Sequence, residues 1–266
     1  MNNYIQADQQ LHRLCQIMAK ANRSFVPEKE DDSHTNLGFN ADKQQIESRW
    51  IKTASGKIRL ILRLTDVCYV WQDEEEEAIQ TISTAKKYVH DIEQQVAKTI
   101  QDVGLDVDAF KEPLHFEIPE YHFANQPVAL LSRLALNEWI FWRTLANNAC
   151  DYLLDKLDQE VEIRIWPHHF DTGIYTDLNE NLGIGFGLAM KDDKVNAPYF
   201  YATCYLKNGE ADYSKVPSLS FGKWMVGDWK GAVLSLNQME FRNSEGSFNK
   251  VSSFIDESMK WYLEKE

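Results

Sequence analysis

The residues with the most evident chemistry lie in one short run, Trp166-Pro167-His168-His169-Phe170-Asp171-Thr172-Gly173. This run follows the apolar segment 161–166, and Pro167 ends strand pairing there and turns the chain. Asp171 lies two residues after His169, where a carboxylate can orient an imidazole ring. We therefore predict that His169 acts as a base or a ligand and that Asp171 positions it.

The two neighbouring histidines do not make a metal site by themselves. On an extended chain His168 and His169 point in opposite directions, and a zinc site needs a third protein ligand that the local spacing does not supply. We predict no metal ion and leave the cofactor open. More distant residues that could join a site are His34, His115, Glu117 and His122. We include Trp166, His168 and His34 among the ligand-contacting residues, and for each histidine a hydrogen bond within a loop is the alternative.

Glu138 is a further carboxylate whose position suggests a special environment. In the amphipathic segment 128–157, a helical rotation of about 100° per residue places it among apolar side chains such as Leu131 and Leu134. A carboxylate is strongly disfavoured there unless it is paired or protonated. We expect Glu138 to be buried, either in an ion pair or hydrogen-bonded network, or as a catalytic or binding carboxylate at the floor of a pocket.

Three glycines recur with a period of two in a strand-like segment. Gly183, Gly185 and Gly187 therefore share one face of a strand, and a helix, an aromatic ring or a ligand could approach the bare backbone. They do not form a dinucleotide-binding fingerprint, because a second strand-like segment follows instead of a helix. We favour helix packing as the reason for these glycines.

The next strand-like segment carries aromatic residues. Tyr199 and Tyr201 lie on the same face of it, and Trp229 follows downstream. If neighbouring strands bring their ends together, these rings form the wall of a cleft that contains His169 and Asp171. We predict this cleft as the site, with Glu138 as a further member.

The elements that must position these residues suggest an α+β fold. Predicted helices cover residues 4–21, 75–103, 128–157 and 248–263, and predicted strands cover 46–53, 57–64, 161–166, 182–190 and 199–206. The strands cluster in runs, so we expect one antiparallel β layer covered by long helices. A single domain over residues 1–266 is the simplest description. Halves 1–110 and 120–266 each have the order helix, strands, helix, so a duplicated unit is the alternative.

An acidic block, residues 73–77, precedes the second predicted helix. Carboxylates complement the positive end of a helix dipole, so we interpret the block as the N-terminal end of the helix over 75–103.

Composition limits the partners and the compartment. With 28 basic and 41 acidic residues the formal net charge is −13, which disfavours binding to nucleic acid. No apolar run is long enough to span a bilayer, and the first residues do not form a secretory signal. The four cysteines form no C-x-x-C pair, which favours free thiols in the cytoplasm. Self-association stays open.

Four short motifs follow one another within residues 161–236: Trp166-Pro167-His168-His169-Phe170-Asp171, Gly185-Phe186-Gly187-Leu188, Pro198-Tyr199-Phe200-Tyr201 and Asp228-Trp229-Lys230-Gly231-Ala232-Val233-Leu234. This region resembles a family of uncharacterised bacterial proteins, a domain of unknown function, in which W-P-x-H-F-D, a G-x-G strand, P-Y-F-Y and W-x-G-A-V-L occur in the same order. The resemblance implies a shared fold and a shared pocket. It implies no reaction.

Two classes of function remain open from the sequence. The first, which we favour, is a protein that binds a small molecule in an aromatic cleft containing histidine, aspartate and glutamate. The alternative is a hydrolase-like enzyme, metal-assisted or not, that uses His169, Asp171 and Glu138. Catalytic triads are assembled in space, so the sequence alone does not decide between them.

Overall fold

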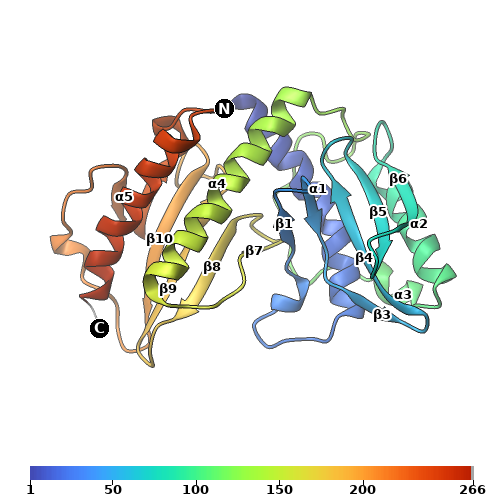
Figure 1. The fold of residues 1–266 in the computed structure, drawn as a ribbon, viewed down its shortest axis with the longest axis horizontal. Helices are drawn as coiled ribbons and strands as arrows, with labels where there is room; N and C mark the ends of the chain where they lie inside the picture. The colour runs from blue at the N-terminus through green and yellow to red at the C-terminus, as the bar shows by residue number, and fades with distance from the viewer. Residues whose placement is uncertain (265–266) are drawn as a thin grey trace. The chain divides into compact units, whose positions relative to one another are not determined.

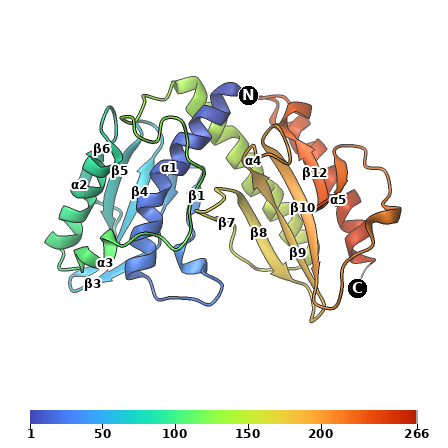
Figure 2. The same ribbon diagram turned by 180° about the vertical axis from the view of Figure 1, so that it is seen from behind.

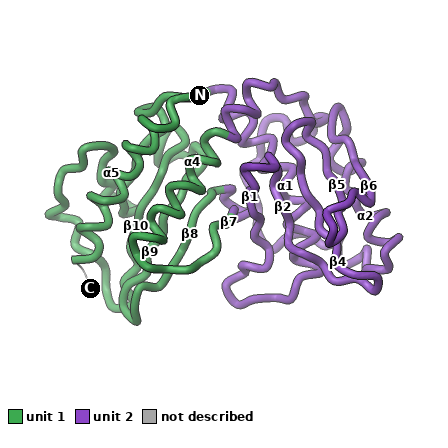
Figure 3. The backbone as a smooth tube through the Cα atoms, viewed as in Figure 1, with its two compact units in different colours: residues 1, 141–164, 171–266 green, residues 2–140, 165–170 purple. Residues whose placement is uncertain are grey.

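The computed structural model describes residues 1–264, and these form two compact units (Figure 3). The N-terminal unit comprises residues 2–140 and 165–170, and the C-terminal unit comprises residue 1, residues 141–164 and the chain from 171 onwards. The boundary lies inside a long helix, α4 (Arg133–Leu157), between residues 140 and 141. Each unit is described separately below.

The N-terminal unit has a long helix, a six-stranded antiparallel sheet and two further helices. Helix α1 (Asn2–Phe25) precedes the strands, and α2 (Val89–Asp102) and α3 (Val107–Lys111) follow them. The strands are β1 (Gly38–Asn40), β2 (Gln45–Glu47), β3 (Ile51–Thr53), β4 (Gly56–Arg63), β5 (Cys68–Asp73) and β6 (Ala78–Ser83). Their order is β1-β2-β4-β5-β6, and β3 also pairs with β4.

Helix α1 packs on one face of this sheet (Figure 2). Its apolar residues recur at helical spacing, and Leu11, Leu14 and Met18 are fully buried. From β5, the Tyr69 hydroxyl donates a hydrogen bond to the Leu14 carbonyl at 2.5 Å. Because side chains alternate along a strand, Val70 points to the other face. We call the face that carries Val70 the outer face of the N-terminal sheet.

The C-terminal unit repeats the order helix, antiparallel strands, helix. It contains residues 141–157 of α4, and α5 (Ser244–Leu263) follows the strands. The strands of its sheet are β7 (Arg164–Ile165), β8 (Thr172–Asp177), β9 (Leu182–Ala189), β10 (Tyr199–Leu206), β11 (Lys223–Val226) and β12 (Lys230–Ser235). The second residue of β7, Ile165, belongs to the N-terminal unit. Their order is β11-β12-β10-β9-β8-β7, so the last hairpin enters the sheet with β12, not β11, beside β10.

Helices α4 and α5 lie on one face of the C-terminal sheet (Figure 1). Arg143 of α4 donates to the Thr172 hydroxyl at 2.7 Å, and Thr172 is in register with Leu188 on β9. Leu188 therefore points to the helices, and the glycines at alternate positions point away from them. The expectation that a helix packs on Gly183, Gly185 and Gly187 is wrong. We call the face that carries these glycines the open face.

The α+β fold class is confirmed, with antiparallel strands and long helices. The expected single layer is wrong, because the predicted strands divide between two sheets. Strands from 46–53 and 57–64 lie in the N-terminal sheet, and those from 182–190 and 199–206 lie in the C-terminal sheet. The predicted strand 161–166 shrinks to β7.

The acidic block 73–77 forms a hairpin turn, and the prediction of a helix end there is wrong. The Asp73 side chain accepts a hydrogen bond from the Glu77 N–H at 2.8 Å, and Glu76 adopts a left-handed φ of 64°. These features close a turn between β5 and β6. The helix predicted from 75 therefore begins only at Val89.

The third predicted helix starts five residues later than expected. Val128 exchanges backbone hydrogen bonds with Lys86 and Lys87, at 3.0 and 2.8 Å, so its backbone is extended and α4 begins at Arg133. Strands β8, β11 and β12 lie in segments that the sequence analysis left without regular structure.

Candidate ligand-binding site

A cavity of about 360 Å³ opens at the C-terminal end of β10 in the C-terminal sheet. It lies where β10 continues beyond β12, since Ala202 is the last β10 residue in register with β12 but the strand runs on to Leu206. The chain after β10 and the turn between β11 and β12 complete it. We call it the β10 cavity. Its lining residues are Thr203, Cys204, Tyr205, Leu206, Gly209, Glu210, Ala211, Tyr213, Asp228, Trp229 and Lys230.

Aromatic rings of this cavity lie directly on glycine backbone. The Trp229 ring covers Gly231 so closely that a Cβ atom there would clash with it. The Tyr205 ring lies over Gly185, where an added Cβ would be 3.2 Å from it. Glycines of the open face are thus covered by aromatic rings of the sheet itself. Because Tyr205 is 52% exposed, its ring remains available to a ligand.

The charges around the cavity do not cancel. Lys230 forms an ion pair with Glu210, and the ammonium group holds the pKa of Glu210 below its usual value. Thr203 donates to the Lys230 carbonyl at 3.1 Å, which fixes the start of β12 beside β10. Asp228 is exposed and makes no hydrogen bond or ion pair with the residues that the structure describes. The lining therefore carries one uncompensated negative charge.

A second polar feature lies on the open face, two residues before Thr203 on β10. The Tyr201 hydroxyl donates to Asp171 Oδ2 at 2.6 Å. Asp171 is only 9% exposed, and its Oδ1 has no hydrogen-bond partner within residues 1–264. Burial, and then the negative charge of Asp171, raise the pKa of Tyr201 well above 10.0. Tyr201 therefore stays protonated and acts as the donor.

Tyr199 lies on the same face of β10 as Tyr201, as expected from the strand period. Its hydroxyl donates to Asp192 Oδ2 at 2.8 Å in the loop before β10, and the residue is buried. Burial is the main cause that raises the pKa of Tyr199, and the hydrogen bond to Asp192 adds to it. Tyr199 therefore stabilises this loop, and its buried ring is not available to a ligand.

The histidine-containing turn is held by α1 within the N-terminal unit. His12 Nε2 donates to the Pro167 carbonyl at 2.9 Å, and Gln16 donates to the same oxygen at 2.8 Å. The His12 ring also stacks on Phe170 with ring centroids 5.1 Å apart. Phe170 has a left-handed φ of 56°, so the chain changes direction sharply between His169 and Asp171.

The structure does not support the predicted role of Asp171 as the residue that orients His169. The Asp171 carboxylate accepts from Tyr201 instead. His169 is exposed, and its ring contacts His168 at a centroid distance of 4.4 Å. His168 is half-buried against Phe116, and Trp166 is half-buried. Because Phe170, which lies between them, has a left-handed backbone, the side chains of His169 and Asp171 have different surroundings.

Glu138 and His34 are both buried residues of the N-terminal unit. Glu138 on α4 is 5% exposed, as the helical periodicity predicted. His34 is also 5% exposed, and its Nδ1 accepts from the Lys29 N–H at 3.3 Å and lies 3.7 Å from Asp32 Oδ1. His34 thus has the loop-stabilising contacts that were the alternative to ligand binding.

The predicted site residues divide between the two units. His34, Glu138, Trp166, His168 and His169 belong to the N-terminal unit, and Asp171, Tyr199, Tyr201 and Trp229 belong to the C-terminal unit. Trp229 is the predicted site residue that lines the β10 cavity.

The sequence analysis missed Thr203, Tyr205 and Tyr213 as site residues. A signal for two of them was present, because Thr203 and Tyr205 continue the period of two that begins with Tyr199 and Tyr201. Tyr213 follows the loop after β10, and no local sequence pattern indicates that the chain comes back to the end of β10 there. It is buried against α5, with its ring centroid 4.8 Å from that of Trp261.

Comparisons with protein-family models, with curated proteins and with solved structures found no match for this chain. The resemblance to a bacterial family therefore stays a prediction. In the described part of the chain, no helix is both long enough and apolar enough to cross a membrane. Residues 1–264 contain no group of three or more histidine, cysteine or acidic side chains arranged to hold a metal ion.

Proposed function

We propose that this protein binds a small organic molecule in the β10 cavity of its C-terminal unit. The observation that carries the proposal is the cavity of about 360 Å³, with aromatic rings on a glycine floor and a few polar groups at its rim. Pockets for small molecules have roughly 300–1,000 Å³ and combine apolar walls with few polar groups. The β10 cavity falls within this range of volumes, and its lining combines aromatic rings with the charged groups of Glu210, Asp228 and Lys230.

Binding is favoured over catalysis by the separate surroundings of the predicted catalytic residues. Asp171 accepts from a tyrosine that stays protonated, and His169 is exposed beside another histidine. A base and the residue that orients it need a direct hydrogen bond. The hydrolase-like alternative, the cytoplasmic location and self-association stay predictions.

Cys204 offers a direct test, because it lines the cavity and is half-buried. The other cysteines are buried, and burial raises the pKa of Cys68 to about 11 and that of Cys150 well above its usual value. Since the thiolate is the reactive form, iodoacetamide should label Cys204 first. Mass spectrometry of the labelled peptides, with Cys204→Ser as a control, identifies the site.

We expect a bound probe to slow labelling of Cys204 in a saturable manner. The probes are choline, its uncharged carbon analogue with a tert-butyl group in place of trimethylammonium, indole and glucose. Trp229→Ala should remove the protection, and Trp50→Ala, which changes an exposed tryptophan of the N-terminal unit, should keep it. If none of the four probes protects Cys204, the proposal is wrong.

A further inference from the structure

The lining of the β10 cavity combines aromatic rings with excess negative charge. Tyr205 and Trp229 present rings to it, and the faces of such rings attract cations. Glu210 and Lys230 neutralise each other, and Asp228 has no partner in the described residues. A ligand that enters therefore meets aromatic faces and an available carboxylate.

The surroundings of the cavity have the same sign. Asp171 accepts a hydrogen bond from Tyr201, which lies on β10 two residues before Thr203 of the cavity lining. The Oδ1 atom of Asp171 accepts no hydrogen bond in the described chain. Burial, and then the negative charge of Asp171, raise the pKa of Tyr205 in the cavity lining. The whole chain has a formal net charge of −13. A field of one sign concentrates ligands of the opposite charge.

An anionic ligand fits these observations poorly. The cationic group in the lining is Lys230, which is already paired with Glu210, so an anion would have to displace a carboxylate while facing Asp228. A neutral sugar could stack on Tyr205 or Trp229, but it would leave the charge of Asp228 uncompensated. A positively charged group uses both the rings and the carboxylate.

Building on the proposed function, we infer that the ligand of the β10 cavity is an organic cation whose positively charged nitrogen lies against Tyr205 and Trp229 and near Asp228. Alkylammonium and quaternary ammonium compounds are the chemical class. The rings supply cation–π attraction, and Asp228 supplies charge neutralisation at the rim.

The test compares choline with its uncharged tert-butyl analogue, which has nearly the same shape. Protection of Cys204 from iodoacetamide gives both affinities on the wild-type protein. We expect choline to bind about three- to thirty-fold more tightly, the range of cation–π contributions. High salt should weaken choline binding and leave the analogue unchanged, because salt screens charge interactions.

A matched pair of variants tests the role of Asp228. Asp228→Asn should weaken choline binding about 1.5- to five-fold, the range of attraction to one exposed charge, and leave the analogue unchanged. Asp193→Asn changes the net charge equally at an exposed position outside the cavity lining, and it should leave both affinities unchanged.

The outcomes separate this inference from the proposed function. If the analogue binds as tightly as choline, or if glucose or indole binds more tightly than either, the cation class is wrong while binding in the cavity stands. If the Asp193 variant weakens choline as much as the Asp228 variant does, the local role of Asp228 is wrong. If no probe protects Cys204, the proposed function itself fails.

Discussion

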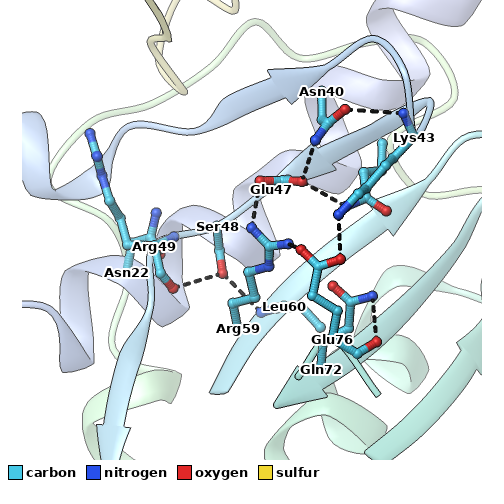
Figure 4. Close-up of polar contacts among 11 residues, drawn as sticks. Asn22, Asn40, Lys43, Glu47, Ser48, Arg49, Arg59, Leu60, Gln72 and Glu76 are labelled. Carbon is cyan, nitrogen blue, oxygen red and sulfur yellow. Dashed lines mark hydrogen bonds and ion pairs between the residues drawn. The ribbon is translucent and has the colours of Figure 1, made fainter. Parts of the chain in front are cut away.

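The two units share the order helix, antiparallel strands, helix, yet the sheet faces that point away from their helices differ in what fills them. On the outer face of the N-terminal sheet, long charged side chains pair with one another (Figure 4). On the open face of the C-terminal sheet, the glycines have no side chains, and aromatic rings pack directly on their backbone.

The outer face of the N-terminal sheet is closed by ion pairs. Arg59 donates to Glu47 at 2.6 Å and to Glu76 at 2.9 Å, and its guanidinium lies 4.5 Å from the Trp50 ring centroid. Lys43 also pairs with Glu76, as Figure 4 shows. Beside this network Ile61, Cys68 and Val70 form a buried apolar cluster. The positive and negative charges of this network pair with one another, and these ion pairs link the side chains of the outer face.

The last hairpin makes the C-terminal sheet different. In the N-terminal unit β4, β5 and β6 follow one another in sequence and in the sheet, but in the C-terminal unit β12 is placed between β10 and β11. The chain must therefore pass the end of β10 before it returns, and the β10 cavity forms at that step. The comparison shows how one arrangement of elements gives a filled face in one unit and a recess in the other.

The largest effect that tests this comparison is expected at Arg59. Arg59→Met should lower the free energy of unfolding by about 1.5–3 kcal/mol, because it removes charge-assisted hydrogen bonds from a residue that is 7% exposed. Lys57→Met, at another residue of β4, breaks an exposed ion pair with Glu74 and should lower the free energy of unfolding clearly less than Arg59→Met does. Urea unfolding measures both. Equal losses would mean that the outer face is not held by its buried charges.

How far the sequence predicted the fold depends on whether the signal was local. Periodicity located α1, α4 and the strands β4, β9 and β10, because each has enough residues to show its period. It failed at residues 73–77, where the same carboxylates suit a helix start and a hairpin turn. The Asp73 to Glu77 hydrogen bond decides between the two, and it depends on β6 pairing with β5.

The site was harder to predict for the same reason. The shared face of Tyr199 and Tyr201 follows from strand period, and Trp229 was included on its residue type. The cavity, however, depends on which hairpin strand lies beside β10, and neither Lys230 nor Trp229 carries a local sign of that choice. The pairing of Asp171 with Tyr201 joins residues thirty positions apart, so no spacing rule could indicate it.

The second prediction concerns two glycines on the open face. A Cβ on Gly187 would lie 2.5 Å from the Thr172 carbonyl oxygen, which belongs to the backbone of β8. A Cβ on Gly185 would meet only the ends of the Tyr205 and Thr203 side chains, at 3.2 and 3.3 Å. Gly187→Ala should therefore destabilise the protein by about 1–3 kcal/mol in urea unfolding, and Gly185→Ala by less than about 1 kcal/mol.

The Gly185 variant also separates stability from binding. It should shift the Tyr205 ring and weaken protection of Cys204 by choline while the protein stays folded. If Gly185→Ala were the more destabilising of the two, the open face would be closely packed instead of available to a ligand.

The third prediction compares two tyrosines of β10. Tyr201→Phe removes the donor to buried Asp171 and leaves both carboxylate oxygens without a partner among residues 1–264, so it should cost about 1–2 kcal/mol of unfolding free energy. Tyr205→Phe changes an exposed ring and should change the free energy by less than about 0.5 kcal/mol. Thermal unfolding monitored by circular dichroism measures the difference. Equal effects would argue against a structural role for the bond between Tyr201 and Asp171.

At neutral pH the smallest effect is expected at Tyr175, which is exposed on the open face and whose titration changes stability only in alkali. Partial burial, and then the hydrogen bond to Asp177 at 2.9 Å, raise the pKa of Tyr175 from 10.0 to about 12. In the N-terminal sheet Tyr69 is fully buried, which raises its pKa well above 10.0. Tyr175 should therefore ionise in the folded protein, whereas Tyr69 should ionise only after unfolding.

The sign of the effect on stability follows from proton binding. An unfolded tyrosine loses its proton near pH 10, but folded Tyr175 keeps it until about pH 12, so the folded state holds more protons between these values. The stability that this difference contributes is complete below about pH 10 and is lost as the pH rises to about 12. Tyr175→Phe should remove one tyrosinate absorbance transition near pH 12 and make the alkaline loss of stability shallower. Tyr69→Phe should leave that transition in place, and its disappearance in the Tyr69 variant would contradict the assignment to the open face.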